Sequence, residues 1–198
     1  SLPYFIKVPM AYQFKTYHKK ILSDTLTPVS IYLKIRDRFP NSILLESSDY
    51  HANDNSFSYI CCNPIASIKF ENETVTKNFP DGTSEEFSID AKTNVVEIID
   101  AFSKAFKADE NDFKFINNGL FGYMAYDAVR YFEDVKLTVK DDTINIPDIY
   151  YAVYQNIIAI NHFKNEAYLF AHCYEADNNI PELEQLLNIR NFATYNFK

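Results

Sequence analysis

Residues 149–175 read IYYAVYQNIIAINHF-KNE-AYLFAHCYE, and this stretch decides the fold class. Two long runs rich in aromatic and β-branched residues, 149–163 and 167–175, are separated by the polar residues Lys164, Asn165 and Glu166. Such runs on both sides of a short polar turn predict two antiparallel strands. This is the strongest hairpin signal in the chain.

Shorter strand and helix signals surround this hairpin, and they do not follow a strict βαβ order. Further strands are predicted over 12–22, 43–49, 57–63, 66–70, 74–79, 86–89 and 119–126. Helices are predicted over 28–39, capped by Thr27 and opened by Pro28, over 94–106, over 129–133 after Asp127, and from Pro181 to about Asn191. This order favours an α+β fold with mostly antiparallel β-sheets and flanking helices.

Length and composition limit the class of protein. The chain has 198 residues, 47% of them hydrophobic, which is typical of one folded domain over residues 1–198. A net charge of −8 without a basic stripe disfavours nucleic acid and anionic membranes as partners. No apolar run has the roughly 20 residues of a membrane helix, and no signal peptide is visible. The chain begins with Ser1, so we expect Met10 to be the natural start and residues 1–9 to be foreign or disordered.

Cysteine, histidine and glycine usage excludes several kinds of site. Cys61, Cys62 and Cys173 cannot make a disulfide framework, which is typical of reduced thiols in a cytoplasmic protein. The four histidines show no metal-ligand spacing, so we expect no metal site. The three glycines form neither GxGxxG nor a P-loop, and GxSxG, HExxH and CxxC are also missing. The classical catalytic sets are therefore missing from the sequence.

Two of the three glycines lie together in Gly119-Leu120-Phe121-Gly122, at the start of a predicted strand. Glycine in a strand permits a close backbone approach or a bulge. We favour tight packing of the sheet, and the alternative is a bare backbone that faces a ligand. Asp127 and Arg130, three residues apart on the predicted short helix, can form a structural ion pair.

Residues 43–48, ILLESS, place a carboxylate and hydroxyl groups at the end of an apolar strand. Strand alternation puts Leu45 and Ser47 on one face and Glu46 on the other. Such a strand end can hold an ammonium group, which needs several acceptors when it leaves water. The alternative is a strand that simply runs out into solvent, and the pattern alone favours that alternative.

Four ordered segments together resemble the amino-terminal domain of anthranilate synthase component I, the subunit that makes anthranilate from chorismate in tryptophan biosynthesis. They are TLTPVS at 25–30, LLES at 44–47, FSYI at 57–60 followed by Asn63-Pro64, and GLFGYMAYD at 119–127 with RYFE at 130–133. Two positions depart from the family pattern. Ser56 stands where the family has arginine before the FSYI segment, and Cys61 stands where it has glycine after that segment.

The resemblance implies a division of labour within a longer subunit. In this family the chorismate site, its magnesium ion and the catalytic groups belong mainly to a carboxy-terminal domain, which we expect to be absent from this chain. The resemblance therefore implies that this chain holds no catalytic residue. The amino-terminal domain supplies one wall of the tryptophan feedback site. The matching effector-binding residues here are Leu45, Glu46, Ser47 and Phe57. The implied partners are tryptophan, the chain's own carboxy-terminal catalytic domain and a glutamine amidotransferase subunit.

Three other interpretations stay open at this point. The chain can be the same domain of aminodeoxychorismate synthase, the folate-pathway relative, although the intact Glu46 favours the tryptophan branch. It can also be a free-standing module that binds an amino acid, or a structural domain whose effector site has lost its function.

Overall fold

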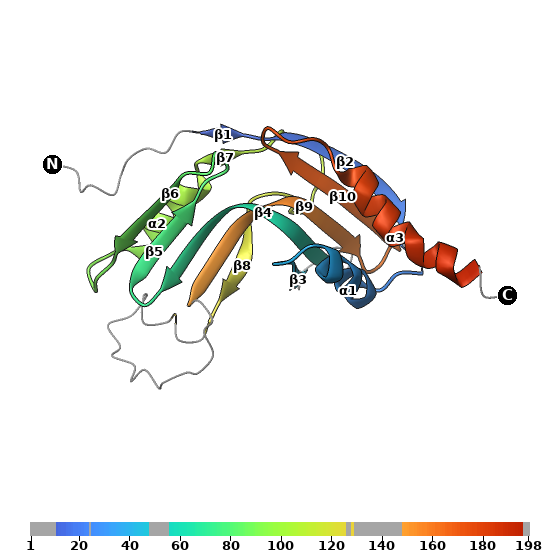
Figure 1. The fold of residues 1–198 in the computed structure, drawn as a ribbon, viewed down its shortest axis with the longest axis horizontal. Coiled ribbons are helices and arrows are strands. Elements are labelled where there is room, and N and C mark those ends of the chain that lie inside the picture. The colour runs from blue at the N-terminus through green and yellow to red at the C-terminus, as the bar shows by residue number, and fades with distance from the viewer. Residues whose placement is uncertain (1–10, 24, 48–55, 126–127, 129–147, 196–198) are drawn as a thin grey trace. The chain divides into compact units, whose positions relative to one another are not determined.

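The computed structural model describes residues 11–23, 25–47, 56–125, 128 and 148–195. The chain divides into two compact units. Unit 1 contains Ser1–Gln13, Ile65–Lys107 and Gly119–Val153, and unit 2 contains Phe14–Pro64, Ala108–Asn118 and Tyr154–Lys198. Strands β4 (Phe57–Glu71) and β9 (Ile149–Asn161) contribute residues to both units (Figure 1).

The main sheet has the hydrogen-bonded strand order β2-β10-β9-β4-β5-β6, with β3 paired to β4 and β8 paired to β9. In unit 2, β10 (Glu166–Cys173) lies antiparallel to both β2 (Lys15–Leu22) and β9, and β3 (Ile43–Ser47) lies antiparallel to β4. The predicted antiparallel hairpin is therefore confirmed as β9 and β10.

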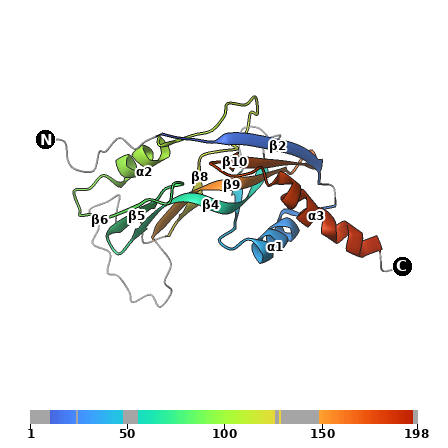
Figure 2. The same cartoon turned by 45° about the horizontal axis from the view of Figure 1, so that its top comes forward.

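Helices α1 (Pro28–Arg38) and α3 (Ile180–Tyr195) cover one face of the sheet in unit 2 (Figure 2). Alternate residues of the strands point toward these helices and form a closed apolar core with them. Its buried members are Ile31, Ile35, Ile60, Cys62, Ile158, Ile160, Ala167, Leu169, Ala171, Cys173, Ile180, Leu183 and Leu187. The opposite face of the same strands carries the aromatic side chains described below.

Unit 1 contains the antiparallel strands β5 (Thr74–Asn78) and β6 (Ser84–Ser88), which follow the carboxy-terminal half of β4, and β8 (Leu120–Met124), which pairs with β9. Helix α2 (Val95–Ser103) has Asn94 as its N-cap. The short strands β1 (Tyr12–Gln13) and β7 (Phe106–Lys107) are parallel. The α+β class with mostly antiparallel sheet is confirmed.

Helix α1 begins where the sequence predicts. The Thr27 hydroxyl accepts from the backbone N–H of Ser30 at 3.1 Å, the Ser30 hydroxyl accepts from the N–H of Thr27 at 3.1 Å, and Pro28 is in the first turn. This reciprocal pair satisfies two backbone donors that the helix leaves free. Among the described residues, no helix is long and apolar enough to cross a membrane.

Several predicted boundaries are wrong. Strand β4 continues through Pro64, and Asn63 directly before this proline has a left-handed φ of 58°. A strand can contain proline at such an irregular position, where one hydrogen bond of the ladder is missing. Helix α2 ends at Ser103, since Phe106 pairs with Tyr12 as part of β7. The predicted strand 12–22 is divided at Phe14, and α3 continues to Tyr195.

Some predictions fall on residues outside the described part of the chain. These are Ser48 and Asp49 at the end of the predicted 43–49 strand, and the short helix 129–133 with the ion pair between Asp127 and Arg130. The domain boundaries 1–198 and the role of residues 1–9 also stay predictions.

Gly122 confirms the close-approach interpretation of the GLFG segment. A Cβ atom at this position would overlap the carbonyl oxygen of Tyr150 and would lie 2.7 Å from the Cα of Tyr151 on β9. Gly119 has no atom near its Cβ position, but its φ of 102° lies in the region that favours glycine. Gly122 is thus required because there is no space for a side chain, and Gly119 is favoured because of its backbone conformation.

Candidate functional site

Strand β3 and the start of β4 bring the sequence-predicted effector residues into one ladder. Leu45 lies opposite Tyr59, Glu46 opposite Ser58, and Ser47 opposite Phe57. Strand β3 has β4 as its one hydrogen-bonded neighbour among the described strands. The outer edge of β3 therefore keeps backbone N–H and C=O groups that no described strand uses.

The two faces of this ladder divide the four predicted residues. Opposed residues of an antiparallel pair share a face, and successive residues alternate. Leu45 consequently shares a face with Phe57, whereas the Glu46 side chain points to the other face, together with Ser58. Leu45 is half-buried, Glu46 is exposed, and Phe57 is only 5% exposed. The carboxylate and the aromatic ring thus do not converge on one point.

Phe57 belongs to a group of rings in stacked, tilted and edge-to-face contact that we call the aromatic cluster. Its members come from β4, β10 and the covering segment Ala108–Asn118, and they are Phe57, Tyr59, Phe113, Phe115, Tyr168 and Phe170. The shortest ring separation is 4.6 Å, between Phe57 and Phe115. Burial raises the pKa of Tyr59 to about 12, so its phenol stays neutral at physiological pH.

The covering segment is fixed to the sheet at both ends by hydrogen bonds. At one end the backbone N–H of Thr16 donates to Asp109 Oδ2 at 2.9 Å. At the other, His172 Nε2 lies 2.7 Å from the carbonyl oxygen of Asn117. Nδ1 of the same imidazole lies 2.9 Å from the Thr16 hydroxyl. The His172 pKa is lowered, chiefly by burial, while the bond to Asn117 and the charge of Asp109 act in the opposite direction.

A serine–histidine contact that the sequence did not reveal lies beside Glu46. Ser58 Oγ and His162 Nε2 are 2.7 Å apart, and the backbone N–H of His162 donates to Ser56 at 3.1 Å. Ser58 is fully buried, so its hydroxyl cannot reach a substrate as a nucleophile. The pair fixes the start of β4. No local pattern could have indicated it, because the two residues are 104 positions apart.

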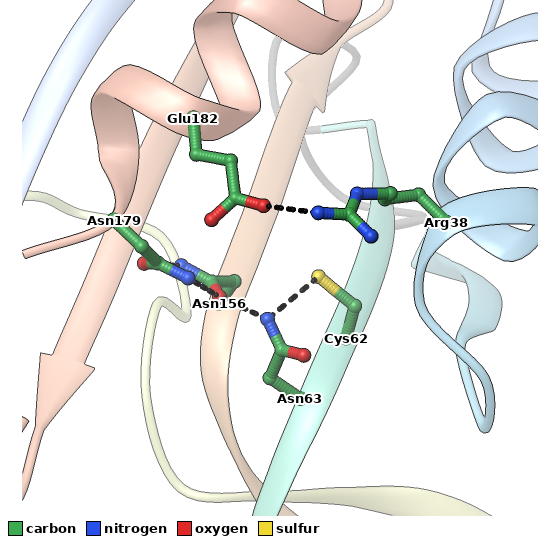
Figure 3. A network of polar contacts seen from close by, with 6 residues as sticks. All are labelled: Arg38, Cys62, Asn63, Asn156, Asn179 and Glu182. Carbon is green, nitrogen blue, oxygen red and sulfur yellow. Dashed lines mark hydrogen bonds and ion pairs between the residues drawn. The ribbon is translucent and has the colours of Figure 1, made fainter.

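A second polar group, shown in Figure 3, lies between α1, α3 and the strands. The side-chain amides of Asn156 and Asn179 bond reciprocally at 2.7 and 2.8 Å, and Asn63 Nδ2 donates to Asn156 Oδ1 at 2.8 Å. Asn156 is fully buried, and its fourth bond goes to the carbonyl of Phe170. Every hydrogen-bonding position of the Asn156 amide is therefore used, which is typical of a structural network.

An ion pair between two helices lies near this network. Arg38 Nη2 lies 3.2 Å from Glu182 Oε1, joining α1 to α3, and both side chains are largely exposed (Figure 3). Burial raises the pKa of the neighbouring Cys62 thiol to about 12, and the charge of Glu182 adds to the increase. Within the described residues, no group of three or more metal-binding side chains occurs.

Comparison with known proteins identifies the family. The family model described as chorismate binding enzyme matches residues 41–195. Anthranilate synthase component 1 of Lactococcus lactis is 31% identical over 154 residues, which cover 77% of this chain and 31% of that protein. Aminodeoxychorismate synthase component 1 of Bacillus subtilis is 26% identical over 159 residues, covering 77% of this chain and 32% of that protein.

A solved structure, anthranilate synthase component I from Streptococcus pneumoniae, aligns with a TM-score of 0.47 and 21% identity, covering 89% of this chain and 37% of that one. The chain spans about a third of the length of the curated relatives it matches. The resemblance to anthranilate synthase component I that the four motifs predicted is confirmed, and the chain belongs to the family of chorismate binding enzymes.

Proposed function

We propose that this chain is the amino-terminal part of an anthranilate synthase component I and supplies one wall of a tryptophan feedback site. The observation that carries the proposal is the ladder at the end of β3. There, Ser47 lies opposite Phe57, and Leu45 lies opposite Tyr59, on a strand whose outer edge pairs with no other described strand. Relatives named anthranilate synthase component 1 and aminodeoxychorismate synthase component 1 support the assignment to chorismate-using enzymes.

The chemistry of a free amino acid fits this strand end. Its ammonium and carboxylate groups need several hydrogen-bond partners when they leave water. The outer edge of β3, which no described strand uses, offers backbone donors and acceptors. The proposal assigns the hydroxyl group of Ser47 to the same ligand. Glu46 takes part through its backbone and through the field of its charge, since its side chain lies on the face away from Phe57. Leu45 is half-buried and supplies apolar surface, whereas Phe57 is 5% exposed and can offer a ligand only a small part of its ring.

Feedback requires that tryptophan favours the state with low chorismate affinity. We propose that the rest of the subunit supplies the opposite wall of the site, the chorismate site, its magnesium ion and the catalytic residues. A glutamine amidotransferase subunit would deliver ammonia to it. The 198-residue chain alone is then inactive toward chorismate and binds tryptophan weakly.

The test compares Ser47→Ala with wild type in the full-length subunit. Calorimetry should show about a tenfold or greater loss of tryptophan affinity, since a hydrogen bond to a charged group is removed. Anthranilate formation without tryptophan should be unchanged. The matched control is Ser84→Ala at an exposed position of β6. A Ser47→Ala subunit that tryptophan still inhibits at wild-type concentrations would contradict the proposal.

The isolated chain offers a second measurement. Because it contains no Trp, the fluorescence of added tryptophan has no protein background at its emission wavelength. We expect little change in emission with the 198-residue chain and saturable binding with the full-length subunit.

The second candidate function is the aminodeoxychorismate branch, supported by the Bacillus subtilis relative. Product analysis separates the two branches. Incubation of the full-length enzyme with chorismate and ammonia yields anthranilate in the first case and aminodeoxychorismate in the second.

A further inference from the structure

We infer that the covering segment Ala108–Asn118 acts as a lid over the aromatic cluster of unit 2, and that it opens when His172 takes up a proton. The inference does not depend on the proposed function, because it uses only contacts between the covering segment, β2 and β10. Neither the sequence motifs nor the similar proteins assign a role to this segment.

The covering segment is attached to the sheet through side chains. It contains no helix or strand. The Thr16 N–H donates to the Asp109 carboxylate at 2.9 Å, and the His172 ring donates to the carbonyl oxygen of Asn117 at 2.7 Å. Each of these bonds uses one side chain, unlike the bonds of a strand ladder. Segments held in this way open more readily than the strands beneath them.

The segment is also tied to itself, so that it can move as one piece. The side-chain amides of Asn111 and Asn117 bond to each other at 2.9 and 3.1 Å. Asn117 Nδ2 also donates to the carbonyl of Phe115 at 3.1 Å, and the N–H of Phe113 donates to Asn111 Oδ1 at 3.2 Å. All four bonds lie within the segment, so none has to break when the contacts with the sheet break.

Aromatic contacts hold the segment closed. Phe113 lies 5.0 Å from His18 and 5.4 Å from Phe170, and Phe115 lies 4.6 Å from Phe57. The strands beneath have their own hydrogen-bonded ladders, β2 with β10 and β10 with β9. The sheet can therefore stay folded when the segment leaves, and the rings of the cluster then become accessible to solvent.

His172 makes this opening depend on protons. Its ring is 2% exposed, stacks on Phe170 at 6.3 Å and has Nδ1 2.9 Å from the Thr16 hydroxyl. Burial has the largest effect on the His172 pKa and lowers it, although the Asn117 carbonyl and the charge of Asp109 act in the opposite direction. Opening returns the ring to water, so the open state binds the proton more readily. Acid consequently favours the open state.

The other groups around the ring do not oppose this direction. Titratable side chains on the same face of β2 and β10 are His18, Lys20 and Tyr168, which the register places two or more residues along the strands. Lys20 forms an ion pair with Glu166 at 2.7 Å. Strand β9 contributes the apolar Ile157 opposite Phe170. Among these groups, the carboxylate that acts on the ring is Asp109, which belongs to the covering segment itself.

Hydrogen exchange measured by NMR tests the inference. The Thr16 N–H is bonded to Asp109, so it reports the departure of the covering segment, and the amides of the β9–β10 ladder are the reference. We expect weaker protection at Thr16 than in the ladder. After correction for intrinsic rates, it should fall by up to about tenfold per pH unit below about pH 6.5. The Nε2 hydrogen of His172, at the other end of the segment, should become exchangeable over the same pH range.

Three variants locate the proton. His172→Gln keeps a donor and an acceptor but does not titrate, so it should remove the pH dependence of Thr16 exchange. His18→Gln removes an exposed imidazole that contacts Phe113, and Asp109→Asn keeps an acceptor for Thr16 while removing the charge. Both controls should retain the pH dependence.

Three results would overturn the inference. Protection of Thr16 that does not change with pH would show that no proton controls the segment. Protection equal to that of the ladder would show that the segment does not open separately from the sheet. Loss of the pH dependence in His18→Gln or Asp109→Asn would place the proton on another group. The wild-type measurements decide the first two points even if His172→Gln does not fold.

Discussion

The imidazole of His172 donates from Nε2 to the carbonyl oxygen of Asn117 across 2.7 Å. A carbonyl oxygen only accepts, so Nε2 carries the hydrogen. In the neutral ring, Nδ1 then accepts from the hydroxyl of Thr16, 2.9 Å away. Both nitrogens of a ring that is 2% exposed are thus satisfied in the uncharged form. The covering segment is attached to the sheet through a titratable group.

This attachment makes stability depend on pH. The folded-state pKa of His172 is lowered by burial, whereas the unfolded chain has the ordinary value near 6.5. At a pH below the unfolded-state pKa, the unfolded chain binds more protons than the folded chain. The contribution of His172 to stability is therefore complete above the unfolded-state pKa and is lost as the pH falls toward the folded-state pKa. The free energy of unfolding should fall by up to about 1.4 kcal/mol per pH unit in that range.

Denaturant unfolding between pH 8 and pH 5 measures the effect. His172→Gln should reduce the dependence of the unfolding free energy on pH by the contribution of one proton. His18→Gln, an exposed position on the neighbouring strand, is the control and should leave the His172 contribution in place. Equal slopes for wild type and His172→Gln would show that the ring does not carry this proton linkage.

Gly122→Ala tests the close contact between β8 and β9. The new methyl group would overlap the backbone of Tyr150, which cannot move as a side chain can, so we expect a loss of about 3 kcal/mol in stability. Gly82→Ala is the control, because Gly82 has a φ of 84° but open space around its Cβ position. It should cost about 1–2 kcal/mol through backbone strain alone. Thermal and denaturant unfolding compare the two, and a smaller loss at Gly122 would contradict the geometry.

Asn156→Leu tests the amide network. The substitution removes four hydrogen bonds and leaves the half-buried amides of Asn63 and Asn179 without this partner. We expect a loss of about 2–4 kcal/mol in unfolding free energy. Asn78→Ala removes one exposed hydrogen bond to Ser67 and should cost about 0.5 kcal/mol or less. A Leu variant as stable as the Ala control would mean that the network does not contribute to stability.

The thiols should report unfolding rather than surface chemistry. All three cysteines are buried and free, and burial raises the pKa of Cys61, Cys62 and Cys173. The thiolate is the reactive form, so a thiol reagent at pH 8 should label almost nothing in the native chain. In denaturant all three thiols should react. Rapid labelling of one thiol under native conditions would indicate a local opening.

Local signals in the sequence predicted the local parts of the fold. The Thr27 cap with Pro28 and the polar turn between the two long strands are determined by residues a few positions apart. The continuation of β4 through Pro64 was not predictable, because it depends on the unusual φ of Asn63. Phe106 likewise fits the apolar stripe predicted for the helix 94–106. In the structure it pairs with Tyr12 and is part of strand β7 instead.

The candidate site was predictable only as a motif. The LLES segment indicated Leu45, Glu46 and Ser47, and strand alternation correctly separated Glu46 from its neighbours. The aromatic cluster and the His172–Asn117 bond were not indicated, because they join the covering segment to strands that lie far from it in the sequence. Long-range packing, rather than local preference, forms these contacts.

The absence of a side chain at Gly122 also selects how β8 and β9 are aligned. In the observed register Gly122 lies opposite Tyr151, and a Cβ atom on it would overlap the backbone of Tyr150. A slip of one residue would bring Phe121 or Tyr123 into that place and would turn every side chain of β8 to the other face. The one residue without a side chain thereby excludes the misaligned alternatives.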